Sequence, residues 1–405
     1  MNHIKMSSEL CCGCTACASV CPKKCISFCI DEEGFKIPKV DEEKCIDCGL
    51  CKKTCPALNS DFESVLDFEQ KTYAFQYLDD RVRKKSASGA LFPAFANFFI
   101  KNLNGYVCGC ILDENLMPRH ILSNRCEDIQ RMQDSKYVQS DMTDVIDNIG
   151  ILLKDEKFVL FTGTSCQVSG LYAYLNRKDI SSERLLTIDF FCHGVPSPLI
   201  WKEYLNYYEV KTSRKVIGYR FRNKKDGWGK TRATRGSCFL STVFYKQANK
   251  TKFDDVSFIA RHWRNIFFSN LCIRKYCHHC PYANINKPAD ITMGDFWGIE
   301  FSHPNFDDHK GCSLALIRND KAFRWFTQLP NSEYIEVTIK DVIERQGNAF
   351  EPSRPNSKRD IFWKDYFEFG FPYVFKKYFG GDFKSFSKDI IKYILSLVSN
   401  KNWTR

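Results

Sequence analysis

The feature that most constrains this chain is a pair of cysteine runs in its first 55 residues. Both runs have the spacing Cys-x2-Cys-x2-Cys-x3-Cys-Pro, with cysteines at positions 11, 14, 17 and 21 and again at 45, 48, 51 and 55. Three cysteines at this spacing place three sulfurs around a tight loop, which suits three corners of an iron–sulfur cubane. Structural zinc is the main alternative, but zinc usually takes two Cys-x-x-Cys pairs without the third cysteine and the final Cys-Pro. The runs therefore predict iron–sulfur clusters.

The fourth ligand of each cluster is expected from the other run, because the chain turns away after the third cysteine. We therefore predict two [4Fe–4S] clusters, one on Cys11, Cys14, Cys17 and Cys55 and the other on Cys45, Cys48, Cys51 and Cys21. In this respect residues 1–60 resemble a bacterial two-cluster ferredoxin. Three further cysteines of this region fit no ligand position and are expected to be buried thiols: Cys12, Cys25 and Cys29.

The total of 21 cysteines in 405 residues argues against a secreted disulfide scaffold. The number is odd, eleven of the cysteines lie in the first 55 residues, and no secretory signal opens the sequence. A reducing compartment, the cytoplasm, is the expected location. The longest nearly unbroken apolar stretch, residues 91–100, is far shorter than the ~20 residues of a membrane-spanning helix. We expect no transmembrane segment, and peripheral membrane contact stays open.

After about residue 70 the pattern changes to alternating strands and helices, which predicts a mixed α/β (α+β) body. Residues 26–40, in the cysteine-rich region before it, predict a hairpin with Gly34 in its turn. The sequence lacks GxGxxG and GxxxxGK[ST], so neither a standard dinucleotide fold nor a P-loop is predicted. Strands are predicted over 71–78, 105–112, 158–161 and 185–191, and helices after a cap at Ser88, from Thr143 or Asp144 to about 155, over 165–175 and from Pro196.

The chain divides into four predicted parts: a ferredoxin-type domain over 1–60, two domains of the body over 70–155 and 156–320, and a helical extension over 321–405. The extension is rich in aromatic and basic residues, and residues 361–379 alone hold ten Phe, Tyr or Trp. Helices packed over the body are the favoured interpretation of this extension. The alternative is an interfacial or partner-docking surface.

Four segments of the body carry candidate site residues. Residues 86–89 (Ser-Ala-Ser-Gly) open an apolar helix, where free backbone N–H groups could hold a phosphate-sized anion or where serine simply caps the helix. Cys166 and Cys192 each follow a buried strand, where open α/β folds place their sites. A nucleophilic Cys166 is an alternative, whereas a pair between Cys192 and the next histidine is disfavoured because adjacent residues seldom face each other. Cys277 and Cys280 form a Cys-x-x-Cys pair that by itself suits zinc or a redox dithiol.

Several motifs, taken in order, resemble the beta-subunit family of coenzyme F420 hydrogenase/dehydrogenase. These motifs are SASG, SKYVQS, GTSCQ, CHG, FRNKKDGW, and Cys-x-x-Cys followed by ADITMGDFWG. The resemblance runs from about residue 70 to about residue 320, behind the ferredoxin-type domain. It implies a fold that couples iron–sulfur clusters to a flavin, usually FAD, which exchanges a hydride with a deazaflavin or another organic acceptor.

The resemblance also implies site residues, while no catalytic residue is identified. The match to the family's Ser/Gly loop implies flavin-phosphate contacts for Ser86, Ser88 and Gly89. The SKYVQS segment would line the flavin pocket with Lys136, Tyr137 and Ser140. Four motif cysteines would supply the thiolates of a third [4Fe–4S] cluster: Cys166, Cys192, Cys277 and Cys280.

Much of the net charge of +11 comes from residues 211–235, which carry ten Lys or Arg against the single acid Asp226. Such a stretch could bind a polyanionic cofactor or substrate, could be a solvated face, or could contact nucleic acid. The first interpretation is favoured. No recognised nucleic-acid-binding fold accompanies the stretch, so we expect no nucleic-acid partner.

We therefore predict a flavin- and iron–sulfur-dependent oxidoreductase. Electrons would pass from ferredoxin or another redox protein through the clusters to FAD, and on as hydride to a small organic acceptor. Coenzyme F420 or a biosynthetic intermediate, for example in polysaccharide synthesis, would serve as acceptor. The alternative is a non-catalytic electron-transfer subunit of a larger redox complex. The direction of electron flow and a homo-oligomeric state stay open.

Overall fold

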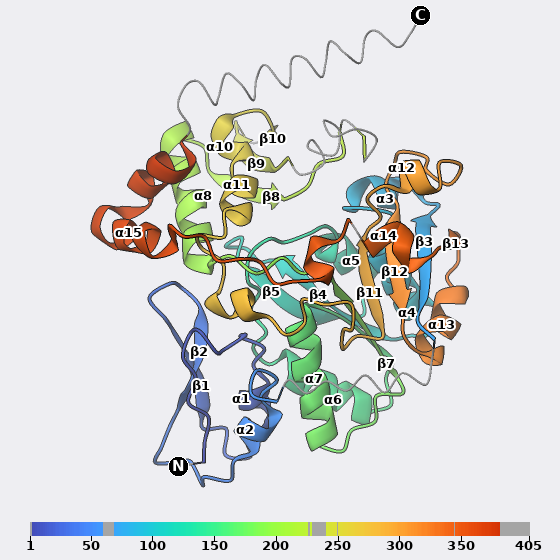
Figure 1. Ribbon diagram of the computed structural model, residues 1–405, viewed down its shortest axis with the longest axis horizontal. Coiled ribbons are helices and arrows are strands. Elements are labelled where there is room, and N and C mark those ends of the chain that lie inside the picture. Colours follow the sequence, from blue (N-terminus) through green and yellow to red (C-terminus); the bar gives the residue numbers. More distant parts are fainter. Residues whose placement is uncertain are drawn as a thin grey trace, which may run out of the picture.

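The computed structural model describes residues 2–59, 69–225, 227–228, 240–248, 250–343 and 345–380. The cysteine-rich unit at its start holds a two-stranded hairpin and two short helices (Figure 1). In chain order these are α1 (Ala16–Val20), β1 (Ile26–Ile30), β2 (Lys36–Val40) and α2 (Leu50–Thr54). The predicted hairpin is confirmed, and Gly34 in its turn has a φ of +87°, which favours glycine.

The body is built on an eight-stranded mixed sheet, so the mixed α/β prediction is confirmed. Strands β4, β6, β7 and β11 pair in parallel, whereas β5 at one flank and β12, β3 and β13 at the other pair antiparallel. The spatial order is β13 (Ser332–Glu336), β3 (Lys71–Tyr77), β12 (Ser313–Ile317), β11 (Ile291–Asp295), β7 (Leu185–Phe190), β6 (Val159–Thr162), β4 (Tyr106–Leu112) and β5 (Pro118–Ser123).

Helices cover both faces of this sheet (Figure 1). Because side chains alternate along a strand, Phe161 of β6 packs toward α6 and α7, whereas its neighbour Leu160 packs toward α4 and α13. The cysteine-rich unit shares the first of these two cores. The helices are α6 (Val145–Lys154) and α7 (Ser165–Arg177) on one side, and α4 (Leu91–Lys101), α5 (Cys126–Met132) and α13 (Asp320–Thr327) on the other.

A smaller unit of three antiparallel strands and several helices has an aromatic core of its own. At its centre the rings of Trp201 and Trp263 lie 4.7 Å apart. Tyr207 contacts Phe375 at 4.9 Å, so the described part of the aromatic extension packs over the body. The elements are α8 (Pro198–Thr212), β8 (Val216–Arg220), β9 (Thr242–Gln247), β10 (Lys250–Asp254), α10 (Phe258–Arg261), α11 (Trp263–Phe268), α15 (Arg359–Val374) and the π-helical turn η3 (Phe375–Phe379).

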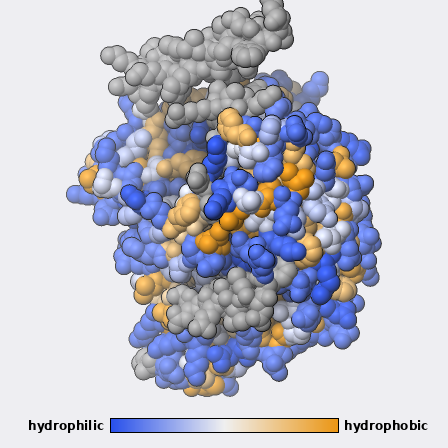
Figure 2. Space-filling view, turned by 45° about the vertical axis from the view of Figure 1, so that its right-hand side comes forward, coloured by the Kyte–Doolittle hydropathy of each residue, from blue (hydrophilic) through white to orange (hydrophobic). Residues whose placement is uncertain are grey.

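Short elements complete the described chain: α3 (Asp80–Lys85), η1 (Lys275–His279), α12 (Ile299–Ser302), α14 (Ile339–Ile343) and η2 (Gly347–Ala349). Residues 381–405, the end of the predicted extension, lie outside the described residues. Among the residues that are described, none of the helices combines the length and the apolar character needed to cross a bilayer. Figure 2 shows a face on which hydrophilic side chains predominate around a narrow apolar band.

Some predictions of local structure were wrong. Ser88 does not cap α4. The helix begins after Ala90, whose φ is +70°, and the Ser88 hydroxyl instead donates to Cys312 O at 2.6 Å. Asp144 precedes α6 but its side chain makes no capping hydrogen bond. The extension is not wholly helical, because β13 pairs with the edge of β3. Strands β11, β12 and β13 pair with β7 and β3, which are distant in sequence, and local periodicity does not reveal such partners.

The hairpin holds the cysteine-rich unit against the body through buried polar contacts. The carboxylate of Glu33, at the tip, pairs with the guanidinium of Arg359, and these side chains are only 12% and 7% exposed. Ser197 Oγ donates to Glu33 O at the start of α8. Arg274, which is fully buried, donates to Cys11 O and to Lys36 O. Contacts of this kind fix the position of the unit, because buried charges must keep their partners.

Replacing Arg359 should therefore destabilise the protein strongly. Arg359→Leu removes the guanidinium that holds both oxygens of the buried Glu33 carboxylate and leaves only the Lys275 ammonium, 3.7 Å away, which costs about 3 kcal/mol of unfolding free energy. Arg354→Leu is the matched control: its ion pair with Glu351 is 82% and 58% exposed, and its loss should cost about 1 kcal/mol or less. Urea denaturation followed by near-UV circular dichroism measures both changes. Equal small losses in the two variants would contradict the proposed anchoring.

Candidate metal centre

The two cysteine loops of the N-terminal unit are built alike. Thr15 before α1 and Gly49 before α2 both have left-handed backbone, with φ of 68° and 72°, which turns each loop back toward its sulfurs. The set expected to hold the first cluster is buried, and burial together with mutual repulsion raises the pKa of Cys17 and of Cys55. The expected ligands of the second cluster, Cys21, Cys45, Cys48 and Cys51, line one cavity, which we call the second cavity.

Backbone N–H groups point at several of these sulfurs. Gly13 N lies 3.4 Å from Cys11 Sγ, Ile4 N lies 3.2 Å from Cys51 Sγ, and Asp47 N lies 3.4 Å from Cys45 Sγ. Such donors favour the thiolate over the thiol, which is the form that binds metal. The residues present therefore fit iron–sulfur clusters, in donor type and in the hydrogen bonds around them.

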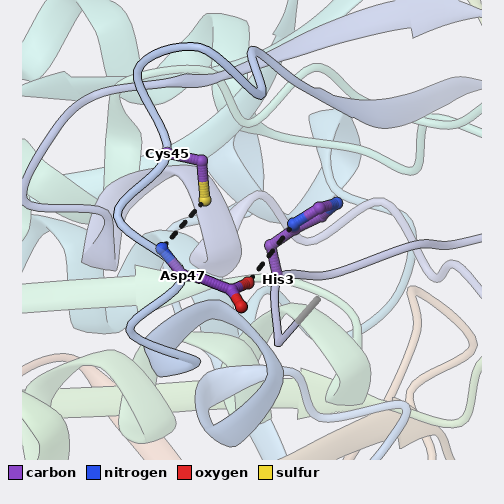
Figure 3. A group of neighbouring side chains, drawn as sticks. All are labelled: His3, Cys45 and Asp47. Atoms are coloured by element: carbon purple, nitrogen blue, oxygen red, sulfur yellow. Dashed lines mark hydrogen bonds and ion pairs between the residues drawn. The ribbon is translucent and has the colours of Figure 1, made fainter.

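His3 lines the second cavity, and Asp47 lies next to it and to Cys45 (Figure 3). The His3 ring is 5% exposed, and its Nδ1 lies 3.5 Å from Asp47 Oδ1. The ligand atoms of His3, Asp47 and Cys45 fall within 4.8 Å of one another, close enough for a single metal ion. Cys45 already belongs to the set expected for the second cluster, so His3 and Asp47 are better described as the outer wall of that site.

The two spare thiols Cys12 and Cys25 are buried as predicted, and both lie at metal-ligand sets, whereas Cys29 is partly exposed. Cys25 lines the second cavity, with its sulfur 3.4 Å from that of Cys21. Cys12 lines a different cavity, described next, where its thiol is hydrogen-bonded to those of Cys14 and Cys166.

The four motif cysteines of the body meet in one place. Cys166, Cys192, Cys277 and Cys280 all line a single cavity, which we call the third cavity. Cys166 begins α7 directly after β6, and Cys192 follows β7, so both come from the carboxyl ends of parallel strands. Cys277 and Cys280 come from the turn η1 and the residue after it. The structure therefore brings together residues that are up to 114 positions apart in the sequence.

Main-chain hydrogen bonds explain this convergence. Ser197 N donates to Cys272 O at 2.9 Å and Arg274 N donates to Val195 O at 3.0 Å, which ties the loop after Cys192 to the loop before Cys277. Gly194, with a φ of +135°, permits the approach, since a Cβ there would lie 3.3 Å from the Cβ of Cys277. At the start of α7, which supplies the remaining cysteine, Thr164 Oγ1 lies 3.1 Å from Cys166 Sγ.

The electrostatics of the third cavity require a cation if its thiols are to ionise. Burial, together with repulsion from neighbouring cysteines, raises the pKa of Cys192 to about 12 and that of Cys280 to about 11. Burial likewise raises the pKa of Cys277. The Lys287 ammonium opposes these shifts at Cys192 and Cys280. Four thiols that resist ionisation alone, yet converge, are suited to a metal cluster whose positive charge deprotonates them.

The first cysteine set approaches the third cavity closely. Helix α7 runs between them, and a Cβ on Gly170 would lie 2.8 Å from Cys14 Sγ. Cys12 lies between Cys14 and Cys166 by its two hydrogen bonds. Arg274 Nη1 donates to Gln139 Oε1 at 2.7 Å, and Gln139 lines the third cavity as well. The N-terminal unit thus supplies part of the cavity wall.

The Ser/Gly loop expected at a flavin contacts the segment before Lys136, but the hydroxyls of its two serines point into the protein. Ser86 Oγ donates to Val82 O at 3.0 Å and accepts from Gln133 Nε2 at 2.9 Å, while Ser88 donates to Cys312 O. A Cβ on Gly89 would lie 2.2 Å from Phe75 O, so this glycine is required for packing.

The segment around Lys136 runs from the Ser/Gly loop to the third cavity. Lys136 Nζ donates to four carbonyls, including Gln133 O at 2.5 Å, and burial lowers its pKa to about 8. The Tyr137 ring stacks on Phe267 at 4.6 Å. Ser140 Oγ accepts from Gln167 Nε2 at 3.0 Å, beside Cys166.

The basic stretch folds back onto the same region. Lys224 Nζ donates to Ser88 O at 2.9 Å and to Arg83 O at 2.6 Å, and burial lowers its pKa to about 7. Arg222 pairs with Asp295 at 2.7 Å and Arg220 with Asp134 at 3.4 Å. Within residues 211–225 the positive charge is thus largely matched by carboxylates of the fold. Asp226, Lys230, Arg232 and Arg235 lie outside the described residues.

Sequence reasoning missed Cys12, Gln139, Arg274 and Lys287 as residues of the site. The adjacent pair Cys11-Cys12 was a signal for Cys12, because the ligand spacing of this run does not need a cysteine at position 12. Gln139 lies inside the SKYVQS motif, which was a signal for it, whereas nothing in the sequence around Arg274 and Lys287 indicated where they lie.

Comparisons with known proteins agree with this architecture. Residues 156–342 match the family model for the C terminus of the coenzyme F420 hydrogenase/dehydrogenase beta subunit, and residues 37–60 match a 4Fe-4S binding domain. The cavity cysteines Cys166, Cys192, Cys277 and Cys280 all lie within the first match.

Curated relatives match over parts of their length. An uncharacterized polyferredoxin-like protein from Methanocaldococcus jannaschii is 33% identical over 84 residues, 19% of this chain and 49% of that protein. A coenzyme F420-dependent sulfite reductase from the same organism is 27% identical over 175 residues, 42% of this chain and 26% of that protein. The chain therefore spans about half or less of these relatives. A chain of the F420-reducing [NiFe] hydrogenase complex from Methanosarcina barkeri aligns with a TM-score of 0.44 and 13% identity, over 69% of this chain and 87% of that one.

The close packing of α7 against the first cysteine set gives a test. Gly170→Ala should lower stability by about 1–3 kcal/mol through overpacking and should reduce iron retention, because the added methyl would meet the Cys14 sulfur. Intrinsic helix propensity alone predicts the opposite, a gain of about 1 kcal/mol. Gly347→Ala is the control, since a Cβ there meets nothing within 4 Å. Thermal melts with iron analysis measure both variants; a stabilised Gly170→Ala protein with full iron would refute the packing.

Proposed function

We propose that this chain, which over residues 156–342 belongs to the coenzyme F420 hydrogenase/dehydrogenase beta-subunit family and also carries a 4Fe-4S binding domain, is a flavin- and iron–sulfur-dependent oxidoreductase. It moves electrons between a redox protein such as ferredoxin and a small organic acceptor. The observation that carries the proposal is the third cavity, where four cysteines from three loops of the body meet beside a thiol of the ferredoxin-type unit.

The three cysteine sets form a series from the surface inward. Cys48 of the second cavity is exposed, so this is the end that a redox partner can approach. The first set, Cys11, Cys14, Cys17 and Cys55, is buried against α7. The third cavity follows on the far side of Cys12. When bound at these sets, iron–sulfur clusters supply one-electron transfer, and a flavin supplies the exchange between single electrons and a hydride.

The chain's own contribution is to hold these sites at fixed separations. Arg274 connects the Cys11 loop, the hairpin and Gln139, and Arg359 fixes the hairpin tip through Glu33. The buried first set and the apolar core around α7 exclude water between the sites. An electron-transfer series needs this rigidity, because the spacing of the centres must not vary.

The flavin is proposed to bind near the Ser/Gly loop, between residues 86–89 and 133–140. These segments are joined by the bond between Ser86 and Gln133, and the second of them reaches the third cavity at Gln139. Lys136 and Lys224 place two amino groups beside them, and an anionic cofactor there would favour the charged form of each over the neutral form that burial promotes. Because the hydroxyls of Ser86 and Ser88 are used inside the fold, main-chain groups of the loop would contact the flavin phosphate.

The acceptor is proposed to be a deazaflavin such as coenzyme F420 or another organic intermediate, for example one of polysaccharide synthesis. The relation of the chain to a coenzyme F420-dependent sulfite reductase supports a deazaflavin. A second candidate function is that of an electron-transfer subunit within a larger complex. It is favoured by the hydrogen bonds that use Ser86 Oγ, Ser88 Oγ and Lys136 Nζ inside the fold.

The deciding experiment is anaerobic purification of the full chain, with iron, sulfide and flavin measured per chain. The proposal expects about twelve irons, three clusters of four, together with about one flavin. The chain should then reduce an acceptor when supplied with dithionite-reduced ferredoxin. Clusters that are reduced without flavin or acceptor turnover would favour the electron-transfer subunit. A measured content of about eight irons per chain would exclude the third cluster.

Removing one cysteine of the third cavity should remove one cluster. Cys277→Ala should lower the iron content by about four per chain and leave about eight, because the remaining three thiolates cannot complete the set. Cys272→Ala is the matched control: Cys272 is fully buried nearby but lies in the aromatic core rather than in the cavity. It should keep about twelve irons. Iron analysis with Mössbauer spectroscopy measures both, and equal iron contents in the two variants would contradict the assignment.

A further inference from the structure

The wall of the third cavity contains a buried lysine. Lys287 is only 2% exposed and lines the cavity together with Cys166, Cys192 and Cys280. Its Nζ donates to Tyr282 O at 2.6 Å and lies 3.5 Å from Ser165 Oγ, and it sits 5.4 Å from the centre of the Phe191 ring. An ammonium group is costly to bury, so its position requires negative charge nearby.

The carboxylates around Lys287 do not fully supply that charge. The Asp189 carboxylate attracts both Lys287 and Arg318 electrostatically. The Asp290 carboxylate attracts Arg318 and forms an ion pair with Lys321. This group of buried residues therefore has three cations for two carboxylates, an excess of one positive charge. Asp189 Oδ1 accepts from Thr292 Oγ1 at 2.5 Å, and Arg318 Nη1 donates to the same hydroxyl at 2.7 Å. Of the three cations, only Lys287 lines the cavity.

We propose that Lys287 is a positioning residue that directs this excess positive charge toward the four cysteines and raises the reduction potential of the cluster they hold. The inference rests on the proposed third cluster. One-electron reduction adds one negative charge to the cavity and breaks no bond, so a nearby ammonium favours the reduced form. A raised potential makes the third centre the favoured destination of electrons that arrive from the first cysteine set.

Lys287 also has a structural contact, which the test must separate from its charge. The hydrogen bond to Tyr282 O closes the turn that follows Cys280. Lys287→Gln keeps an N–H donor but removes the charge, whereas Lys287→Arg keeps both. Lys321→Gln removes a charge from the same buried group outside the cavity, because Lys321 pairs with Asp290 and donates to Ser182 O.

The experiment is a redox titration of the full chain with dithionite, followed by electron paramagnetic resonance. The third cluster is identified as the signal that Cys277→Ala removes. Lys287→Gln should shift its reduction equilibrium at least tenfold toward the oxidised form, which is about 59 mV lower for a one-electron couple. Lys287→Arg should keep the wild-type potential of this cluster. Lys321→Gln should lower it by much less than Lys287→Gln does, because Lys321 lies outside the cavity and is 15% exposed, so that solvent screens its charge. The two ferredoxin-type clusters should be unchanged in every variant.

A second variant keeps the test decisive if Lys287→Gln does not retain the cluster. Asp189→Asn removes the neighbouring negative charge and should raise the potential instead. An unchanged potential in Lys287→Gln with full iron, an equal fall in Lys321→Gln, or an unchanged or lower potential in Asp189→Asn would overturn the inference. A wild-type protein with only about eight irons would instead refute the third cluster itself, which the iron count reveals before any titration.

Discussion

The structure depends above all on the buried guanidinium of Arg274. Its donors reach the Cys11 carbonyl, the Lys36 carbonyl of the hairpin and the Gln139 side chain, and its own main chain belongs to the loop that leads to Cys277. One side chain therefore joins a ferredoxin-type loop, the hairpin, the segment after Lys136 and the wall of the third cavity. A guanidinium suits this position because its planar donors can serve several carbonyls at once while the charge stays satisfied.

The docked position of the N-terminal unit places its cysteines beside the scattered cysteines of the body. Had this unit been joined by a flexible linker alone, Cys12 would be a spare thiol and Gly170 an ordinary helical glycine. Because the unit is docked, Cys14 packs against Gly170, and Cys12 is hydrogen-bonded to Cys166. The approach of the two cysteine sets is thus a property of packing between α1 and α7, and the proposed electron path follows from it.

Charge in the interior is arranged around the same sites. The basic stretch that dominates the net charge turns inward at two residues: Arg222 pairs with Asp295, and Lys224 is held by main-chain carbonyls. Lys287 contributes a further ammonium at the third cavity. Buried cations beside thiolates and anionic cofactors are functionally useful because low dielectric strengthens their effect, and each is tolerated because the fold supplies acceptors.

The sequence by itself determined the two N-terminal cysteine sets, the hairpin at Gly34 and the alternating strands and helices of the mixed sheet, because each of these is encoded by local spacing or periodicity. It also predicted, through the family resemblance, which four body cysteines belong together. Only the tertiary structure decided that Ser88 bonds to Cys312 O rather than capping α4, that β13 joins the edge of β3, and that Cys12, Gln139 and Lys287 line one cavity. These outcomes depend on contacts between residues far apart in the chain, and no local pattern records which distant surfaces will be buried together.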